Sequence, residues 1–255
     1  MTRVIAAIDN SLAAGPVLAT ARAVAQLFDA DLEAVHVRQN GYEAARRQAE
    51  AAGLSLRTTE GPSVESLVAA ARPDDVEALV LGSRGMPGPR PAGRTAIEVI
   101  GSITKPVVVV PPLARPAKRV QRVLLPLEGT TQTSLAPAAA LELALDADVE
   151  LIALHVYDER SLPSFTDQPQ HETEAWTREF VARYCPQGVR SVRLELRVGR
   201  PEEHVLRVAE ENDVDLIALG WNQSLVPGRA AIVRAVLERG TTPLLLIPVQ
   251  TSESP

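Results

Sequence analysis

The nine residues Arg3-Val4-Ile5-Ala6-Ala7-Ile8-Asp9-Asn10-Ser11 have a counterpart later in the chain, Arg122-Val123-Leu124-Leu125-Pro126-Leu127-Glu128-Gly129-Thr130. The two stretches are 119 residues apart, since 122 − 3 is 119, and His155-Val156 follows His36-Val37 at the same spacing. Solenoid repeats are only about 20 to 50 residues long. A repeat of this length therefore indicates two copies of one globular domain.

The repeat continues through a second set of landmarks, at a larger spacing. Leu81-Gly82 returns as Leu219-Gly220, which is a shift of 138 because 220 − 82 is 138. The second copy therefore holds 19 extra residues, since 138 − 119 is 19. We expect much of this insertion in the polar segment 158–170, as an exposed loop, and in a longer helix through Trp176 to Tyr184.

Composition limits the class of protein. The 255 residues suit two domains of ordinary size, and 45% hydrophobic with 23% charged residues is typical of globular chains. A net charge of −6 argues against a nucleic-acid partner bound through its phosphates. The chain has no apolar run near the roughly 18 residues that a membrane span needs. We expect a cytoplasmic protein with no membrane partner, in which the single Cys185 is structural.

Short runs of Val, Ile and Leu alternate with longer segments of helical period, which predicts a parallel α/β sheet with helices on both faces. Each copy is predicted to be a doubly wound lobe with five strands. The predicted strands are Val4 to Ile8, Leu32 to Val37, Leu54 to Thr58, Val76 to Leu81 and Val107 to Val110, then Val123 to Leu127, Leu151 to Val156, Val192 to Val198, Val214 to Leu219 and Leu244 to Ile247.

The boundary between the copies is marked by proline. The segment Pro111-Pro112-Leu113-Ala114-Arg115-Pro116 cannot continue a helix and is expected to be extended. We therefore predict a first domain at residues 1–112, a linker at 113–119 and a second domain at 120–250.

Candidate binding residues of the first copy follow its first and fourth strands. Asp9 follows the first strand, Gly82-Ser83-Arg84-Gly85 follows the fourth, and Gly93-Arg94-Thr95 opens the next helix. Ligands of doubly wound sheets bind at the carboxyl ends of the strands. Glycines let a backbone approach a phosphate, and a helix N-terminus attracts anions. Arg84, Arg90 and Arg94 add positive charge, so the loop is a candidate anion site.

A structural interpretation of the same residues is equally open. Glycine and proline also build ordinary surface loops, in which the arginines are simply solvated. Asp9 has a structural role available as a cap for a helix that begins near Ser11. His36 and His155, at the ends of buried strands, are interpreted as structural histidines rather than catalytic bases.

Over nearly its whole length the chain resembles the universal stress protein family in its tandem form. The resemblance rests on four motifs. The first strand ends in Asp-x-Ser (Ile8 to Ser11), and the second strand ends in His-Val (His36-Val37, and His155-Val156 in the second copy). A Leu-Gly-Ser-x-Gly turn (Leu81 to Gly85) and a final Lys-Pro-Val run (Lys105 to Val110) follow. It implies two lobes of the adenine nucleotide α-hydrolase-like, or Rossmann-like, type. Because single-domain relatives usually pair through their fifth strands, it also implies that Val107 to Val110 and Leu244 to Ile247 meet as antiparallel neighbours in an intramolecular pseudo-dimer.

Family members that bind ATP carry Gly-x2-Gly-x9-Gly-Ser/Thr, with an Asp near the adenosine and a backbone contact to adenine after the strand-two His. The resemblance thus implies nucleotide-binding residues at Asp9, Val37, Gly82, Gly85, Gly93, Arg94 and Thr95. Only seven residues separate Gly85 from Gly93, and Arg94 takes the place of the hydroxyl residue. Either Thr95 supplies that hydroxyl from the next position, or Arg94 pairs with the phosphate itself.

The second copy departs further from the pattern. Glu128 replaces the Asp, Trp221 follows Gly220, and Gln223 and Ala230 stand where the second and third glycines belong. A side chain at 223 occupies space that a phosphate needs, and Trp221 is bulky enough to cover the crevice. We therefore expect this copy to bind no ATP.

The leading functional hypothesis is a stress-response sensor or adaptor that is not an enzyme. It binds ATP, with or without Mg²⁺, in the first copy, and ligand binding alters a surface that a protein partner contacts. One alternative is a ligand-free interaction protein in which both sites have decayed. A slow ATPase is the third hypothesis, for which the sequence offers no evident base or nucleophile. Association of the chain into a homodimer is compatible with all three.

Overall fold

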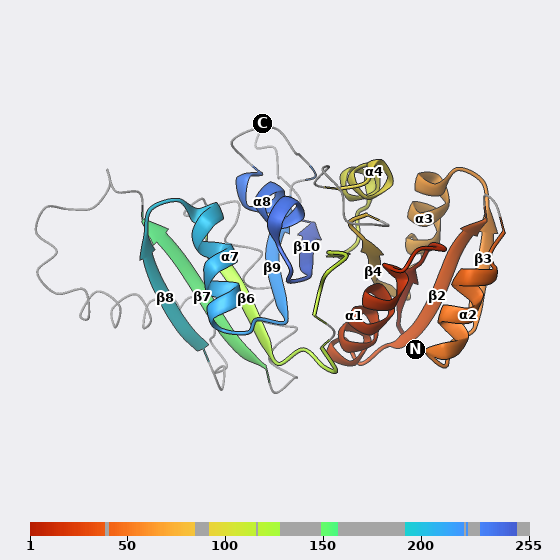
Figure 1. The fold of residues 1–255 in the computed structure, drawn as a ribbon, viewed down its shortest axis with the longest axis horizontal. Helices are drawn as coiled ribbons and strands as arrows, with labels where there is room; N and C mark the ends of the chain where they lie inside the picture. Colours follow the sequence, from red (N-terminus) through yellow and green to blue (C-terminus); the bar gives the residue numbers. More distant parts are fainter. Residues whose placement is uncertain are drawn as a thin grey trace, which may run out of the picture.

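The computed structural model describes residues 1–38, 41–84, 92–115, 117–127, 149–157, 192–221, 223 and 230–248. The strands of these residues form one ten-stranded sheet in the order β3-β2-β1-β4-β5-β10-β9-β6-β7-β8, from one end of the molecule to the other (Figure 1). Their bounds are β1 Arg3–Ala7, β2 Asp31–Arg38, β3 Leu56–Glu60, β4 Val76–Gly82, β5 Val107–Val110, β6 Arg122–Leu127, β7 Glu150–Tyr157, β8 Val192–Val198, β9 Leu216–Trp221 and β10 Leu244–Pro248.

The two halves of the sheet repeat one topology. The order β3-β2-β1-β4-β5 of the first lobe is matched by β8-β7-β6-β9-β10 in the second. Within each half the neighbouring strands are parallel, as the apolar runs predict. The chain is therefore a tandem pair of doubly wound α/β lobes, and the predicted fold class is confirmed.

All ten predicted strands are present, and two of them start two residues later than the prediction. The amide of Leu54 donates to the carbonyl of Ala49, and the amide of Val214 donates to that of Ala209. Each bond closes the last turn of the preceding helix around a residue with positive φ, Gly53 or Asp213. Leu54 and Val214 thus belong to helix C-terminal turns, and β3 and β9 begin only after them.

The lobes join through their fifth strands. β5 and β10 are antiparallel, with Val109 opposite Leu244, Val108 opposite Leu245 and Val107 opposite Leu246. These side chains are buried on both faces of the sheet. The pairing removes two apolar edges that would otherwise be open to other chains, and it confirms the predicted pseudo-dimer.

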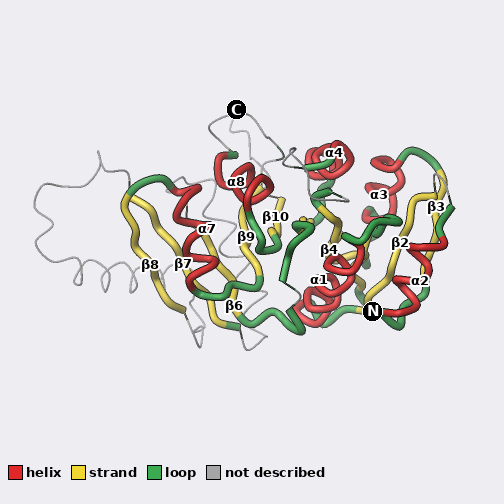
Figure 2. The backbone as a smooth tube through the Cα atoms, viewed as in Figure 1, coloured by secondary structure: helices red, strands yellow, loops and turns green. Residues whose placement is uncertain are grey.

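Described helices lie on both faces of the first lobe's half of the sheet and on one face of the second lobe's half. The described helices are α1 Ala14–Leu27, α2 Glu43–Ala51, α3 Ser63–Ala71, α4 Arg94–Ser102, α7 Pro201–Glu211 and α8 Ala231–Arg239. α1 and α2 pack in the core on one face, and α3, α4, α7 and α8 pack in the core on the other. Figure 2 shows α7 lying across β6 and β7. Both cores continue across the junction, because alternate residues of β5 and β10 point to opposite faces.

Pro201 begins α7, and Glu202 and Glu203 lie in its first turn, where a carboxylate interacts favourably with the helix dipole. The predicted loop at 158–170 and the helix at 176–184 lie outside the described residues. Among the described helices, none is both long and apolar enough to cross a membrane.

Candidate functional site

A cleft of about 430 Å³ opens in the first lobe, where β1 and β4 end. β1 lies between β2 and β4, so the connections that follow β1 and β4 leave the sheet on opposite faces and a crevice remains between them. Six of the seven predicted site residues line this cleft: Asp9, Val37, Gly82, Gly93, Arg94 and Thr95. The seventh, Gly85, and also Arg90, lie outside the described residues.

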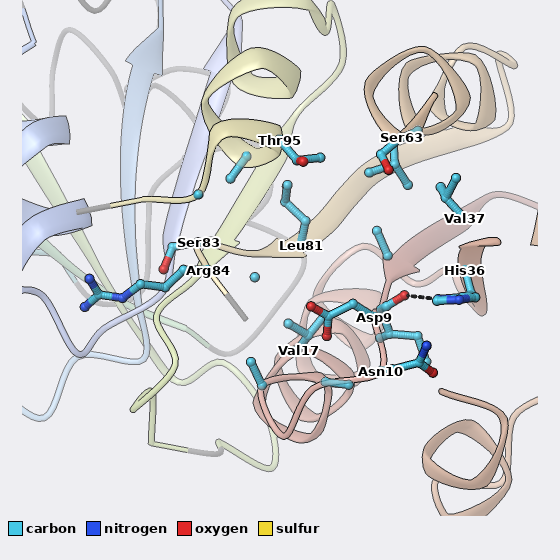
Figure 3. A pocket seen from close by; sticks show the side chains of 18 of the residues that line it. Asp9, Asn10, Val17, His36, Val37, Ser63, Leu81, Ser83, Arg84 and Thr95 are labelled. Atoms are coloured by element: carbon cyan, nitrogen blue, oxygen red, sulfur yellow. Dashed lines mark hydrogen bonds between the residues drawn. The ribbon is translucent and has the colours of Figure 1, made fainter. Parts of the chain in front are cut away.

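Asp9 stands at one side of the cleft and Thr95 at the other (Figure 3). The Oδ1 atom of Asp9 accepts hydrogen bonds from the backbone amide of Ser11 at 2.9 Å and from the Ser11 hydroxyl at 2.6 Å. The carboxylate is exposed. It is therefore oriented by a tight local turn and still accessible to a ligand.

The predicted capping role of Asp9 is wrong. α1 begins at Ala14, three residues after Ser11, and Ala13 occupies the N-cap position. The Ser11 hydroxyl accepts a bond from the Ala13 amide at 3.2 Å, so Ser11 satisfies the amide next to the helix. Asp9 orients Ser11 and does not itself cap the helix.

Asn10 and His36 hold the Asp9 turn to neighbouring elements. The Oδ1 atom of Asn10 accepts a bond from the Ala45 amide in the first turn of α2 at 3.0 Å. His36 is buried, and its Nδ1 atom lies 2.8 Å from the carbonyl oxygen of Ile8 (Figure 3). The structural interpretation of His36 agrees with this contact. The role of Asn10 was missed, because nothing in the sequence near Asn10 indicates a partner 35 residues away.

The two described glycines of the site are not required by the backbone. A Cβ atom at Gly82 would lie 3.5 Å from Val17, and a Cβ at Gly93 would lie 3.5 Å from the carbonyl oxygen of Ser83. Both distances are ordinary van der Waals contacts, and Gly93 has a φ of −68°, which any residue adopts. The fold itself would accept alanine at both positions. Glycine there leaves the wall of the cleft free of side chains.

The N-terminus of α4 forms another wall. Gly93 is its N-cap, and its amide donates to the carbonyl of Ser83 at 2.6 Å, which ties the helix start to the end of β4. The amides of the next three residues, Arg94, Thr95 and Ala96, precede the first intrahelical bond, that of Ile97 to Gly93. Three backbone donors and the positive end of the helix dipole are thus present at the cleft.

The two described arginines of the cleft, Arg84 and Arg94, differ in the direction of their side chains. The Arg94 Nε atom donates to Glu98 Oε1 at 2.6 Å, and this bond and the negative charge of Glu98 raise the pKa of the Arg94 guanidinium. The Arg94 side chain is 89% exposed, so its two terminal nitrogens are accessible. The Arg84 side chain extends away from Asp9 and Thr95 (Figure 3). Arg94 is therefore the arginine best placed to contact an anion in the described part of the cleft.

In the second lobe two residues that depart from the nucleotide-binding pattern, Trp221 and Gln223, contact the first lobe. Trp221 is 2% exposed, and its indole Nε1 donates to the carbonyl of Ile100 in α4 at 3.1 Å. The Gln223 side-chain amide donates to the carbonyl of Ile103 at 2.5 Å. The indole thus points to the first lobe, and the expectation that Trp221 covers the crevice of its own lobe stays a prediction, because most residues around that crevice lie outside the described residues. Glu128 lies outside the described residues, and Ala230 is the buried N-cap of α8.

His155 repeats the arrangement of His36. It forms a hydrogen bond with the backbone of Leu127, the counterpart of Ile8, and stacks edge-on against Tyr157 at 4.6 Å between ring centroids. Burial lowers the pKa of His155, and the bond to Leu127 partly opposes this. The described residues contain no group of three or more side chains that could hold a metal ion.

The chain is similar to one protein family and to several solved structures. The model of the universal stress protein family matches residues 38–111 and 119–248. A universal stress protein from Archaeoglobus fulgidus DSM 4304 is 17% identical with a TM-score of 0.68, over 96% of this chain and 98% of that one. A putative universal stress protein from Pseudomonas aeruginosa UCBPP-PA14 is 14% identical with a TM-score of 0.62, over 98% and 94%. A functionally unknown protein from Pseudomonas aeruginosa PAO1 is 13% identical with a TM-score of 0.63, over 98% and 93%. The search of curated proteins gave no match. At these identities, the likeness to the solved structures shows a shared fold.

Proposed function

The chain belongs to the universal stress protein family, and on that premise we propose that its first lobe binds an adenine nucleotide, ATP with or without Mg²⁺. In this proposal the protein is a cytoplasmic sensor or adaptor and not an enzyme. A nucleotide bound in the cleft changes the surface that a protein partner contacts.

The observation that carries the proposal is that the N-terminus of α4, with Arg94, and the Asp9 carboxylate line opposite sides of one cleft. The first-turn amides of α4 and the Arg94 guanidinium suit phosphate oxygens. The exposed carboxylate of Asp9, on the opposite side, suits the hydroxyl donors of a ribose. A molecule with a phosphate at one end and a sugar further along satisfies both.

Val37 offers a place for the base. In a parallel ladder, alternate residues direct their amide and carbonyl to the same neighbouring strand. The carbonyl of Val35 accepts a bond from Ile8, so Val37 directs its backbone groups to the same side, where β1 has already ended at Ala7. These groups face the cleft and suit the hydrogen-bonding edge of adenine.

The ligand-free interaction protein is the second candidate. The contacts of Trp221 and Gln223 with α4 favour it, because they show that one copy of the loop already serves the junction between the lobes. A protein that kept only the joined lobes would need no nucleotide.

Calorimetric titration of the whole chain with ATP tests the proposal. We expect saturable heat at or below millimolar ATP, and binding about tenfold weaker in Asp9→Asn, since a carboxylate acceptor is stronger than an amide oxygen. Asp29→Asn is the matched control, because Asp29 lies in a tight turn with a φ of 48° that asparagine also tolerates. Absence of both heat and thermal shift with the wild type would refute nucleotide binding.

Mass spectrometry of small molecules released from gently purified protein separates the three hypotheses. Bound ATP or AMP supports the sensor, and protein that releases no ligand supports the interaction protein. Product that accumulates with time would show an enzyme instead.

A further inference from the structure

Two side chains of the second lobe end on the helix that forms the anion wall of the first. The Trp221 indole donates to the carbonyl of Ile100, and the Gln223 amide donates to the carbonyl of Ile103. Both acceptors lie at the C-terminal end of α4, opposite the end that lines the cleft. One short helix thus connects the candidate site with the junction between the lobes.

These bonds satisfy groups that the helix cannot satisfy itself. The last four carbonyls of a helix have no intrahelical donor. At Ile103, the C-cap, the chain turns into an extended conformation with a ψ of 140°, which ends the helical pattern. The buried indole N–H also needs an acceptor, because a buried donor without one is costly. The contact therefore constrains both partners.

In the second lobe these donors stand at positions that correspond to the segment after β4 in the first lobe. The repeat shift of 138 makes Trp221 the counterpart of Ser83 and Gln223 the counterpart of Gly85, since 221 − 138 is 83 and 223 − 138 is 85. Gln223 has a φ of 60°, a conformation that glycine adopts at less cost. The second lobe keeps a side chain at a backbone position that favours glycine, and that side chain contacts α4.

We propose that Trp221 and Gln223 are positioning residues for the anion site of the first lobe. They hold the C-terminal end of α4, and because a nine-residue helix moves as a unit, they also fix where its N-terminal amides stand in the cleft. Donors at the C-terminal carbonyls further polarise the helix in the direction that favours an anion at its N-terminus. The second lobe thus supports a site to whose lining none of its described residues belongs.

This inference rests on the proposed function, and it implies that nucleotide binding is thermodynamically linked to the contact of α4 with the second lobe. A phosphate at one end of α4 and the second lobe at the other stabilise the same helix position, so each contact strengthens the other.

Two variants test the inference in the whole chain. Trp221→Phe keeps an aromatic ring in the junction and removes the N–H donor. Gln223→Gly removes the amide, relieves the positive φ and leaves the core intact. Arg115→Gln is the control, because it removes the contact between the linker and Asp213 in the second lobe without touching α4.

The measurements are the ATP dissociation constant by calorimetry and the hydrogen exchange of residues 94–102 without nucleotide. We expect dissociation constants about five- to tenfold higher in both variants and unchanged in the control, the lower range of typical coupling between sites. We also expect faster exchange in α4, with the exchange of α8 and of β1 unchanged. A merely structural loss would raise exchange throughout the sheet.

The outcomes separate this inference from the proposed function. Wild type and variants that bind ATP equally well would overturn the positioning role and leave nucleotide binding standing. A wild type that takes up no ATP would overturn the proposed function. In that case the hydrogen exchange of α4 decides. Equal exchange rates in Gln223→Gly and wild type would overturn the inference as well. Faster exchange that is confined to α4 in the variant would support the role of Gln223 in holding this helix.

Discussion

The Nδ1 atom of His36 lies 2.8 Å from the carbonyl oxygen of Ile8, and this contact joins the end of β2 to the residue just before Asp9. His155 and Leu127 repeat it in the second lobe. In both lobes a buried or half-buried imidazole thus fixes the point where the first strand ends. The position of the Asp9 carboxylate in the cleft depends on this bond.

Replacing His36 should therefore affect both stability and binding. We expect His36→Leu to lower the free energy of unfolding by about 1–3 kcal/mol, because the buried carbonyl of Ile8 loses its partner. ATP binding should weaken as well, because the Asp9 turn is no longer held. Urea unfolding and calorimetry measure the two effects. The control His204→Ser introduces the residue that the first lobe has at the equivalent position, Ser66, and should cost less than about 1 kcal/mol. Equal losses in the two variants would contradict the prediction.

The lowered pKa of His155 predicts a pH dependence of stability. Burial holds this pKa in the folded chain below its ordinary value of 6.5, so the unfolded chain binds the proton more readily. The stabilisation is fully present above pH 6.5 and is lost as the pH falls from there through the lower folded pKa. We expect denaturation midpoints of wild type and His155→Gln to converge as the pH is lowered through this window, relative to their difference at pH 8. A difference that is the same at every pH would count against this assignment.

A side chain at Gly82 should block the cleft at little cost to the fold. A Cβ there lies in ordinary contact with Val17, and the added methyls of Gly82→Val extend into the same region. We expect ATP binding to weaken at least tenfold, or about 1.4 kcal/mol, with a much smaller change in the midpoint of thermal unfolding. Gly101→Ala is the control, because a Cβ there meets no atom within 4 Å. Undiminished affinity in Gly82→Val would mean that the ligand does not occupy this wall.

The ion pair between Arg94 and Glu98 predicts opposite effects for its two members. Glu98→Gln frees the guanidinium and removes a negative charge beside it, so ATP should bind a few-fold more tightly at low salt. Arg94→Gln should weaken binding, and both effects should diminish at high salt. Because the pair is exposed, neither change should alter stability by more than about 0.5 kcal/mol. Calorimetric titrations at two salt concentrations check this, and changes of the same sign in both variants would contradict it.

Much of the architecture follows from the order of apolar and polar residues along the chain. Short apolar runs separated by segments of helical period indicate strands, and all ten strands predicted in this way are present. Where the starts of β3 and β9 differ, the reason is local, because Leu54 and Val214 close helix turns with their amides. The site residues that lie together do so for the same general cause: the ends of parallel strands meet at one edge of a sheet.

The sequence by itself determined the duplication and the two doubly wound lobes, because both follow from short-range patterns repeated along the chain. Its likeness to the family pattern also indicated six residues that line the first cleft. Tertiary structure alone decided that Asn10 contacts α2, that Arg84 extends away from Asp9, and that Trp221 contacts Ile100 in the first lobe. The physical reason is that such contacts join residues far apart in the chain, and the Trp221 contact depends in addition on the pairing of β5 with β10 that joins the lobes. Residues 121 positions apart then meet without any local pattern that marks them as partners.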